Sequence, residues 1–246
     1  MRILAEDSFN SVPDPTALTG NELSKSRDTR RRILNAARDL LAANGYARFS
    51  TSAVAEGANL TRPAMLYHFG SRQELLTATI HYLVRRRIEM FEQDMAEAAR
   101  ALGNDRVSIR LAMVDILWEQ VRTPEFVAFQ ELACAARTDP ELATVMQPTL
   151  ALFDRMRATV AFKIMPQHMI RADDFQMVRD IIRFVTEGAA PDYAVTFDRE
   201  RRLAAIRQFL RTLVASAAGA EFIRHVPPVP PASPVSSVPD PSEGQS

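Results

Sequence analysis

The amino-acid sequence predicts an all-α protein, with a small N-terminal domain of three helices followed by a larger helical domain. Alanine, leucine, arginine and methionine are abundant, whereas the 246 residues include only 8 glycines and 4 tyrosines. No stretch alternates apolar and polar residues over the length of a strand, and apolar residues recur at helical spacing instead. With 47% hydrophobic residues, the chain can bury the core of one or two domains.

The two ends of the chain lack helical periodicity, and we expect both to be disordered. Residues 1–22 are rich in proline, serine and threonine, and residues 223–246 hold seven of the 15 prolines. Such segments bury too little apolar area to offset the entropy lost on ordering. The folded part is therefore predicted to consist of residues 23–72 and 73–222.

The first predicted helix lies in the segment RDTRRRILNAARDLLAANG and ends at Gly45, because glycine commonly follows a helix C-terminus. Its apolar stripe consists of Ile33, Ala36, Ala37, Leu40 and Leu41. A second, two-turn helix follows. It has Ser50 or Thr51 as N-cap and closes at Asn59, a residue that tolerates the left-handed conformation.

Thr61 caps a third predicted helix, RPAMLYHF, which has Pro63 in its first turn, where a missing backbone donor costs nothing. Its residues Met65, Leu66 and Phe69 are predicted to face the core. Ser71 caps a long amphipathic helix that follows. The apolar stripe of that helix consists of Leu76, Ile80, Leu83, Val84, Ile88, Phe91 and Met95.

Two short helices joined by a tight turn in a basic region are typical of a helix-turn-helix motif. The formal net charge of the chain is zero, but residues 25–48 carry seven basic side chains and only two acidic ones. In such a motif the second helix enters the major groove, while hydroxyls and arginines around it bind phosphates. The predicted DNA-binding residues are Arg32, Thr51, Ser52, Thr61, Arg62, Pro63, Ala64, Tyr67, His68 and Arg72.

Arg62, at the start of the second helix of the motif, is the candidate base reader, and Pro63 and Ala64 allow close approach to the groove. Tyr67, His68 and Arg72 can donate hydrogen bonds to phosphate. For residues 30–32 a solvated helix face is an equally good interpretation.

The ungapped run from Arg32 to Leu76 resembles the DNA-binding domain of TetR-family transcriptional regulators, one-component bacterial repressors that release DNA when a small molecule binds. The matching residues are Ala37, Gly45, Thr51, Val54, Ala55, His68, Phe69, Ser71, Arg72, Glu74 and Leu75. The sequence departs from the family pattern at Asn59, where glycine is usual, at Arg72, where lysine is usual, and at Leu66, where tyrosine is common. The resemblance implies a homodimer that binds a pseudo-palindromic operator in double-stranded DNA and a small-molecule effector.

Four or five further helices are predicted between Asp105 and Ala218. Thr123 with Pro124, and Asp139 with Pro140, each pair an N-cap residue with a proline in the first turn. Pro148 falls inside the helix that follows Pro140, so we expect a kink or break near residue 147. Within the resembling family, a broken helix often borders a ligand cavity.

Methionines and aromatic residues are concentrated in this larger region and can line an adaptable apolar pocket. The plainer interpretation, that each of them belongs to the core, stays open. Together they favour a lipophilic or aromatic effector. The candidate pocket residues are Met95, Met113, Leu117, Trp118, Phe126, Phe129, Met146, Leu150 and Phe153.

The last two predicted helices carry apolar stripes that could pack within one subunit or against a second copy. In the resembling family this pair of helices forms a four-helix dimer interface. The candidate interface residues are Val178, Ile181, Ile182, Val185, Leu203, Ile206, Leu210 and Leu213.

Other functional classes receive less support from the sequence. No nucleophile, phosphate-binding glycine loop or metal-ligand spacing indicates an enzyme, a metal site or a cofactor. A helical adaptor that binds proteins and no specific DNA remains an alternative. Cys134 is the only cysteine and is expected to be buried, and the first residues lack the apolar run of a signal peptide. We expect a cytoplasmic protein with no transmembrane helix.

Overall fold

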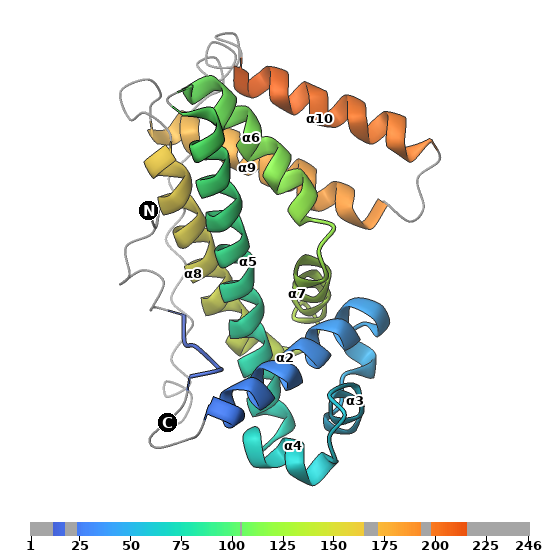
Figure 1. Ribbon diagram of the computed structural model, residues 1–246. Coiled ribbons are helices and arrows are strands. Elements are labelled where there is room, and N and C mark those ends of the chain that lie inside the picture. Colours follow the sequence, from blue (N-terminus) through green and yellow to red (C-terminus); the bar gives the residue numbers. More distant parts are fainter. Residues whose placement is uncertain (1–11, 18–23, 104, 165–171, 193–197, 216–246) are drawn as a thin grey trace, which may run out of the picture.

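The computed structural model describes residues 12–17, 24–103, 105–164, 172–192 and 198–215, and every regular element within these ranges is helical (Figure 1). The all-α prediction is therefore confirmed. The elements are α2 (Ser24–Asn44), the short 3-10 helix η1 (Tyr46–Arg48), α3 (Thr51–Gly57), α4 (Arg62–His68), α5 (Arg72–Leu102), α6 (Arg106–Gln120), α7 (Pro124–Ala135), α8 (Pro140–Ile164), α9 (Ala172–Asp192) and α10 (Arg199–Ala215). None of the described helices combines the length and apolar composition that crossing a membrane requires.

The helix-turn-helix forms because local signals start and stop each helix where the sequence predicts. Gly45 has a φ of 74°, and Asn59, at the turn after α3, has a φ of 52°. The hydroxyls of Ser50, Thr61 and Ser71 accept hydrogen bonds from the amides of the third residue after each of them. Each such cap stabilises its helix by about 1 kcal/mol.

Helix α5 connects the two regions of the molecule, and it packs against α2 in the N-terminal region and against α6, α7 and α8 in the larger one (Figure 1). All seven positions of its predicted apolar stripe are buried. Helix α7 also packs against α2, so the N-terminal helices rest on the larger region at two places. Arg38 Nη1 donates to Glu125 Oε1 at 2.7 Å, and the Tyr46 hydroxyl donates to Asp139 Oδ2 at 2.8 Å.

The segment 12–17 differs from the expectation of a disordered lead-in. The side chain of Val12 is fully buried, and Arg85 Nη1 donates to the Val12 carbonyl oxygen at 2.7 Å. Arg30 Nε donates to the Pro15 carbonyl oxygen at 2.9 Å. The partners come from α2 and α5, so the absence of local periodicity could not reveal them. The remaining residues of 1–22, and the predicted tail 223–246, lie outside the described residues.

In the larger region, the break expected near residue 147 is absent, and so is the burial expected of Cys134. Helix α8 is unbroken through Pro148. Pro148 lacks the backbone N–H that would donate to the Thr144 carbonyl oxygen. Both residues lie on the exposed side of α8, where water can replace the lost hydrogen bond. Cys134 is exposed, because α7 buries the face that carries Phe126, Phe129 and Leu132 and turns Cys134 outward.

Candidate nucleic-acid interface and effector pocket

Helix α4 presents one face to the core and one to solvent. Met65 and Phe69 are fully buried, and Leu66 is half-buried against the core, as the sequence predicts. On the opposite face, four of the predicted DNA-binding residues are exposed together: Thr61, Arg62, Pro63 and Tyr67. The side chain of Tyr67 is 82% exposed, the largest exposure among the described large apolar residues. Ala64 and His68 lie half-buried at the edge of this face.

Thr51, predicted to contact DNA, lies mostly within the protein. It is 9% exposed, and its hydroxyl oxygen accepts a hydrogen bond from Arg62 Nε at 3.2 Å. This contact joins the start of α3 to the start of α4 and holds the Arg62 side chain. Thr51 is therefore placed to orient Arg62, while the neighbouring Ser52 is exposed.

Arg30, which the sequence interpretation left open between a solvated face and a phosphate contact, anchors the end of α4. Its Nη1 donates to the His68 carbonyl oxygen at 3.0 Å, and its guanidinium carbon lies 4.5 Å from the centre of the Phe69 ring. A cation at a helix C-terminus also complements the helix dipole. Arg30 thus fixes the recognition helix on α2.

Arg72 and Arg32 are both exposed beside this surface. Arg72 Nε donates to the Phe49 carbonyl oxygen at 3.4 Å, and its guanidinium lies over the rings of Tyr46 and Phe49 at 5.3 and 5.7 Å. These contacts restrain the side chain and leave part of its donor fork open to solvent.

The predicted pocket residues are divided among a cavity, a groove, a polar hollow and the core. Leu117, Phe126 and Phe153 line a small cavity, about 20 Å³, between α5, α6, α7, α8 and α9. Phe129 and Leu150, with Phe153 again, line an adjoining groove of about 450 Å³ that opens to solvent. Trp118 borders a separate polar hollow between α6 and α10. The remaining three residues, Met95, Met113 and Met146, are buried in the core, as the plainer interpretation has it.

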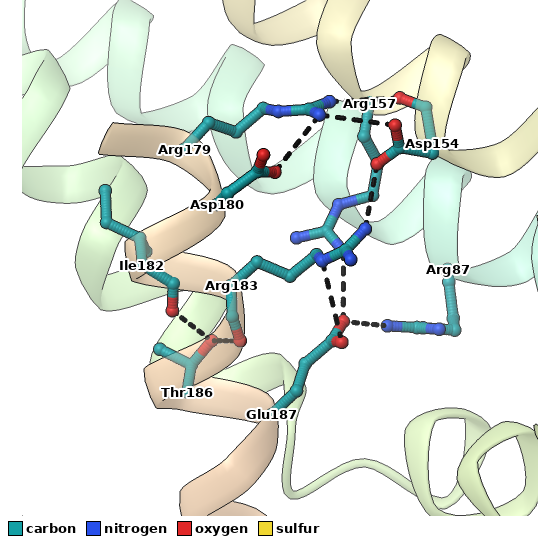
Figure 2. A network of polar contacts seen from close by, with 9 residues as sticks. All are labelled: Arg87, Asp154, Arg157, Arg179, Asp180, Ile182, Arg183, Thr186 and Glu187. Atoms are coloured by element: carbon teal, nitrogen blue, oxygen red, sulfur yellow. Dashed lines mark hydrogen bonds and ion pairs between the residues drawn. The ribbon is translucent and has the colours of Figure 1, made fainter. Parts of the chain in front are cut away.

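The small cavity and the groove meet at two arginines that the sequence interpretation missed. Arg87 and Arg157 line both spaces, together with Glu187 (Figure 2). Arg157 Nη1 donates to Glu187 Oε1 at 3.1 Å, and Arg87 Nη2 lies 3.6 Å from the same oxygen. Arg87 falls on the apolar stripe of α5, three residues after Val84 and four before Phe91, and that position is the signal that could have revealed it.

The surroundings of Arg87 are unusually apolar for a charged group. Its guanidinium carbon lies 5.0, 4.8 and 4.6 Å from the ring centres of Phe126, Phe129 and Phe153. Burial, and after it the neighbouring Arg157, lower the pKa of Arg87 to about 9, against the opposing effect of Glu187. Burial likewise lowers the pKa of Arg157. With a pKa of about 9, Arg87 remains a cation at neutral pH, in a site that disfavours the charge.

The eight residues predicted for a dimer interface are placed mostly inward. Val178, Ile182, Leu203 and Leu210 are buried inside the protomer, because the strongest apolar stripes of α9 and α10 pack on the rest of the domain, including α6. Ile181, Val185 and Leu213 are half-buried, and Ile206 is 37% exposed. The large apolar side chains most exposed on these two helices are Phe184 and Phe209, at 62% and 65%. Sequence reasoning missed both phenylalanines because they lie off the main stripes.

Comparisons with known proteins agree with this architecture. Residues 33–79 match the family model described as bacterial regulatory proteins, tetR family. An uncharacterized HTH-type transcriptional regulator of Mycobacterium tuberculosis is 26% identical over 166 residues, which cover 68% of this chain and 83% of that protein. The HTH-type transcriptional regulator UidR of Escherichia coli is 27% identical over 117 residues, 44% of this chain and 60% of that one.

The fold is also that of solved structures. Salmonella enterica GusR superposes with a TM-score of 0.57 at 20% identity, over 79% of this chain and 97% of that chain. The family match covers the helices that present the exposed face of α4, and the relatives are transcriptional regulators. Residues 33–79 thus carry the match to the tetR family, and the chain is similar to an HTH-type transcriptional regulator over 68% of its length.

Proposed function

We propose that this regulator is a homodimeric repressor that binds a pseudo-palindromic operator and is released from it by a small effector. Residues 23–72 form the DNA-binding domain, and residues 73–222 form the effector-binding and dimerisation domain. The observation that carries the proposal is the exposed face of α4, where Arg62 and Tyr67 stand free of the core on a helix that buries Met65 and Phe69 on its other face.

The DNA contacts divide into base reading and phosphate binding. Arg62 begins α4 and is oriented by Thr51, so its guanidinium is the group that reaches base edges. Tyr67, Ser52, Arg32 and Arg72 bind phosphates around it. Tyr67 takes the place of the tyrosine that is common in the family one residue earlier, because Leu66 at that position is half-buried against the core.

Dimerisation is supported by the apolar side chains that α9 and α10 leave in water. Burying one exposed phenylalanine contributes about 1.5–3 kcal/mol, so a second copy that covers Phe184 and Phe209 is stabilised accordingly. Two recognition helices then reach half-sites about 34 Å apart, or a multiple of that distance. Phe209→Glu is expected to yield a monomer in light scattering, whereas Arg201→Glu, at an 86% exposed position on the same helix, should leave a dimer.

The coupling between effector and DNA is supported by α7. This helix places Phe126 against the cavity and Phe129 against the groove, and it also packs on α2 through the Glu125–Arg38 ion pair. An effector that prefers one placement of α7 therefore changes the placement of the DNA-binding domain. The shift in operator affinity cannot exceed the difference in effector affinity between the two states.

Arg62→Ala tests the proposal directly. A base reader is expected to lose about 1–3 kcal/mol of specific binding. Fluorescence anisotropy with the operator located upstream of the chain's own gene measures that loss. Arg201→Ala removes a surface arginine from α10 and serves as the control. Equal operator affinity of the two variants would reject Arg62 as a reader and favour a protein-binding adaptor.

A further inference from the structure

We propose that the effector site takes an amphipathic organic anion, and that the anion's carboxylate replaces Glu187 as the partner of Arg87 and Arg157. This inference rests on the proposed function for its regulatory meaning, but the binding site itself does not depend on DNA. The ligand class is an aromatic or aliphatic monocarboxylate, whose apolar part lies in the groove beside Phe129, Leu150 and Phe153.

The charges around the site favour an anion over a neutral or cationic ligand. Within the network of Figure 2, the guanidiniums of Arg87, Arg157, Arg179 and Arg183 face the carboxylates of Asp154, Asp180 and Glu187. Four cations against three anions leave one positive charge in excess within this network. The side chains of Arg87 and Arg157 are mostly buried, so an uncompensated charge on them is costly. A ligand carboxylate neutralises that excess, whereas a cation would increase it.

The two arginines differ in how well Glu187 satisfies them. Arg157 makes a hydrogen bond to Glu187 at 3.1 Å, but Arg87 lies 3.6 Å from the same oxygen, longer than a hydrogen bond, and is surrounded by three phenylalanine rings. One carboxylate oxygen thus serves two guanidiniums. An incoming carboxylate with two free oxygens can serve both, in the bidentate geometry that arginine prefers.

Arg183 is an alternative ion-pair partner for Glu187. Arg183 lies one turn earlier on α9, with its Nε 4.0 Å from Glu187 Oε2. That Nε is buried and makes no hydrogen bond in the described part of the chain. A small rotation of the Glu187 side chain toward Arg183 supplies the missing acceptor and vacates the position between Arg87 and Arg157. The exchange breaks the ion pairs of Glu187 with Arg87 and Arg157. The ligand carboxylate replaces Glu187 at both arginines, and Arg183 pairs with Glu187, so the charges stay compensated.

The space available places the apolar part of the ligand in the groove. The closed cavity, about 20 Å³, holds little more than one water molecule. The groove of about 450 Å³ is large enough for a small organic molecule and reaches solvent beside the same two arginines. The charged residues and the apolar residues therefore line one open groove, so a single ligand can contact both.

A matched pair of fluorescent probes tests the proposal with the full chain and without DNA. The first, 8-anilinonaphthalene-1-sulfonate, carries one negative charge, and the second, N-phenyl-1-naphthylamine, has the same rings without the sulfonate. We expect the anionic probe to bind at least about tenfold more tightly, the effect of one charge-assisted contact. Naphthalene-2-carboxylate should displace it, and naphthalene-2-carboxamide should not.

Variants test whether Arg157 and Glu187 set the preference for the anionic probe. Arg157→Met should reduce it to about twofold or less, whereas Arg86→Met, at a 40% exposed neighbour paired with Glu89, should leave it unchanged. Glu187→Gln removes the competing carboxylate and should increase the preference, a gain that loss of a purely structural ion pair does not produce. Circular dichroism checks that each variant is folded. If a variant does not fold, the displacement experiment with the wild-type protein still tests the proposal.

Three results would overturn the proposal: equal binding of the two probes, no binding of the anionic probe, or a preference that Arg157→Met and Arg86→Met retain alike. Failure of DNA binding, in contrast, would leave the probe results intact and would reject only the proposed function. An anion preference without operator binding therefore identifies a ligand-binding protein that does not act on this DNA.

Discussion

The two regions of the molecule use arginine in opposite ways. In the DNA-binding region, Arg32, Arg62 and Arg72 lie at the surface and keep their donors accessible. In the larger region, Arg87, Arg157 and Arg179 are drawn inward and gather around shared carboxylates (Figure 2). An exposed arginine suits the phosphates of a long polyanion, and a buried arginine suits a single small anion in a dry site. This difference underlies the two proposals, in which the first region binds DNA and the second binds a small organic anion.

The largest effect on stability is expected at Phe69. This residue lies on the buried face of α4, and that face holds the exposed face in position. Phe69→Ala removes a fully buried ring beneath Arg30 and should lower the free energy of unfolding by about 3–5 kcal/mol. Tyr67→Ala, two residues earlier and 82% exposed, should leave that free energy unchanged and weaken operator binding. Urea unfolding and anisotropy measure the two quantities. If both variants lost stability equally, the orientation assigned to α4 would be wrong.

The next effect concerns the ion pair that joins the regions. Glu125 is only 5% exposed. Arg38→Met leaves its carboxylate without the Arg38 guanidinium and should lower the free energy of unfolding by about 2–3 kcal/mol. The double variant Arg38→Met/Glu125→Met removes both charges and should recover most of the loss. Thermal unfolding followed by circular dichroism distinguishes these outcomes. Equal stability of the single and double variants would argue against an interaction between the two residues.

The smallest effect is expected at Tyr46, whose hydroxyl donates to Asp139. The backbone amide of Leu142 and then the Tyr46 hydroxyl lower the pKa of Asp139. A carboxylate with a lowered pKa stabilises the folded state above its unfolded pKa, and this contribution disappears as the pH falls through the folded pKa. Tyr46→Phe should therefore lower Tm by about 2 °C at pH 7 and by less in acid. A difference in Tm that grew in acid would contradict this assignment.

The DNA-binding region could be predicted almost completely because its signals are local. Gly45, Asn59, Thr61 and Ser71 each act on the turn of chain that contains them, so their roles can be inferred without knowing the tertiary structure. Arg30 is the exception, since its acceptors at His68 and Pro15 are distant in the sequence.

The effector region was harder to predict because burial there depends on how several helices meet. Met95, Met113 and Met146 looked suited to a pocket, but they fill the core. The groove is lined by Phe129, Leu150 and Phe153, as predicted, but also by charged residues such as Arg157 and Glu187, which composition alone places on a solvated face. Phe184 and Phe209 were missed for a related reason: a stripe analysis finds the face that packs within the protomer and ignores the second apolar face.

One measurement tests the central claim, that the exposed face of α4 makes this chain a sequence-specific DNA-binding protein. The full chain is titrated against the fragment upstream of its own gene and against a scrambled fragment of equal length, at 50–200 mM salt as a rough working range. The account predicts binding to the upstream fragment at least about 10³-fold tighter than to the scrambled one, weakening steeply with salt. Weak binding of equal affinity to both fragments would contradict it.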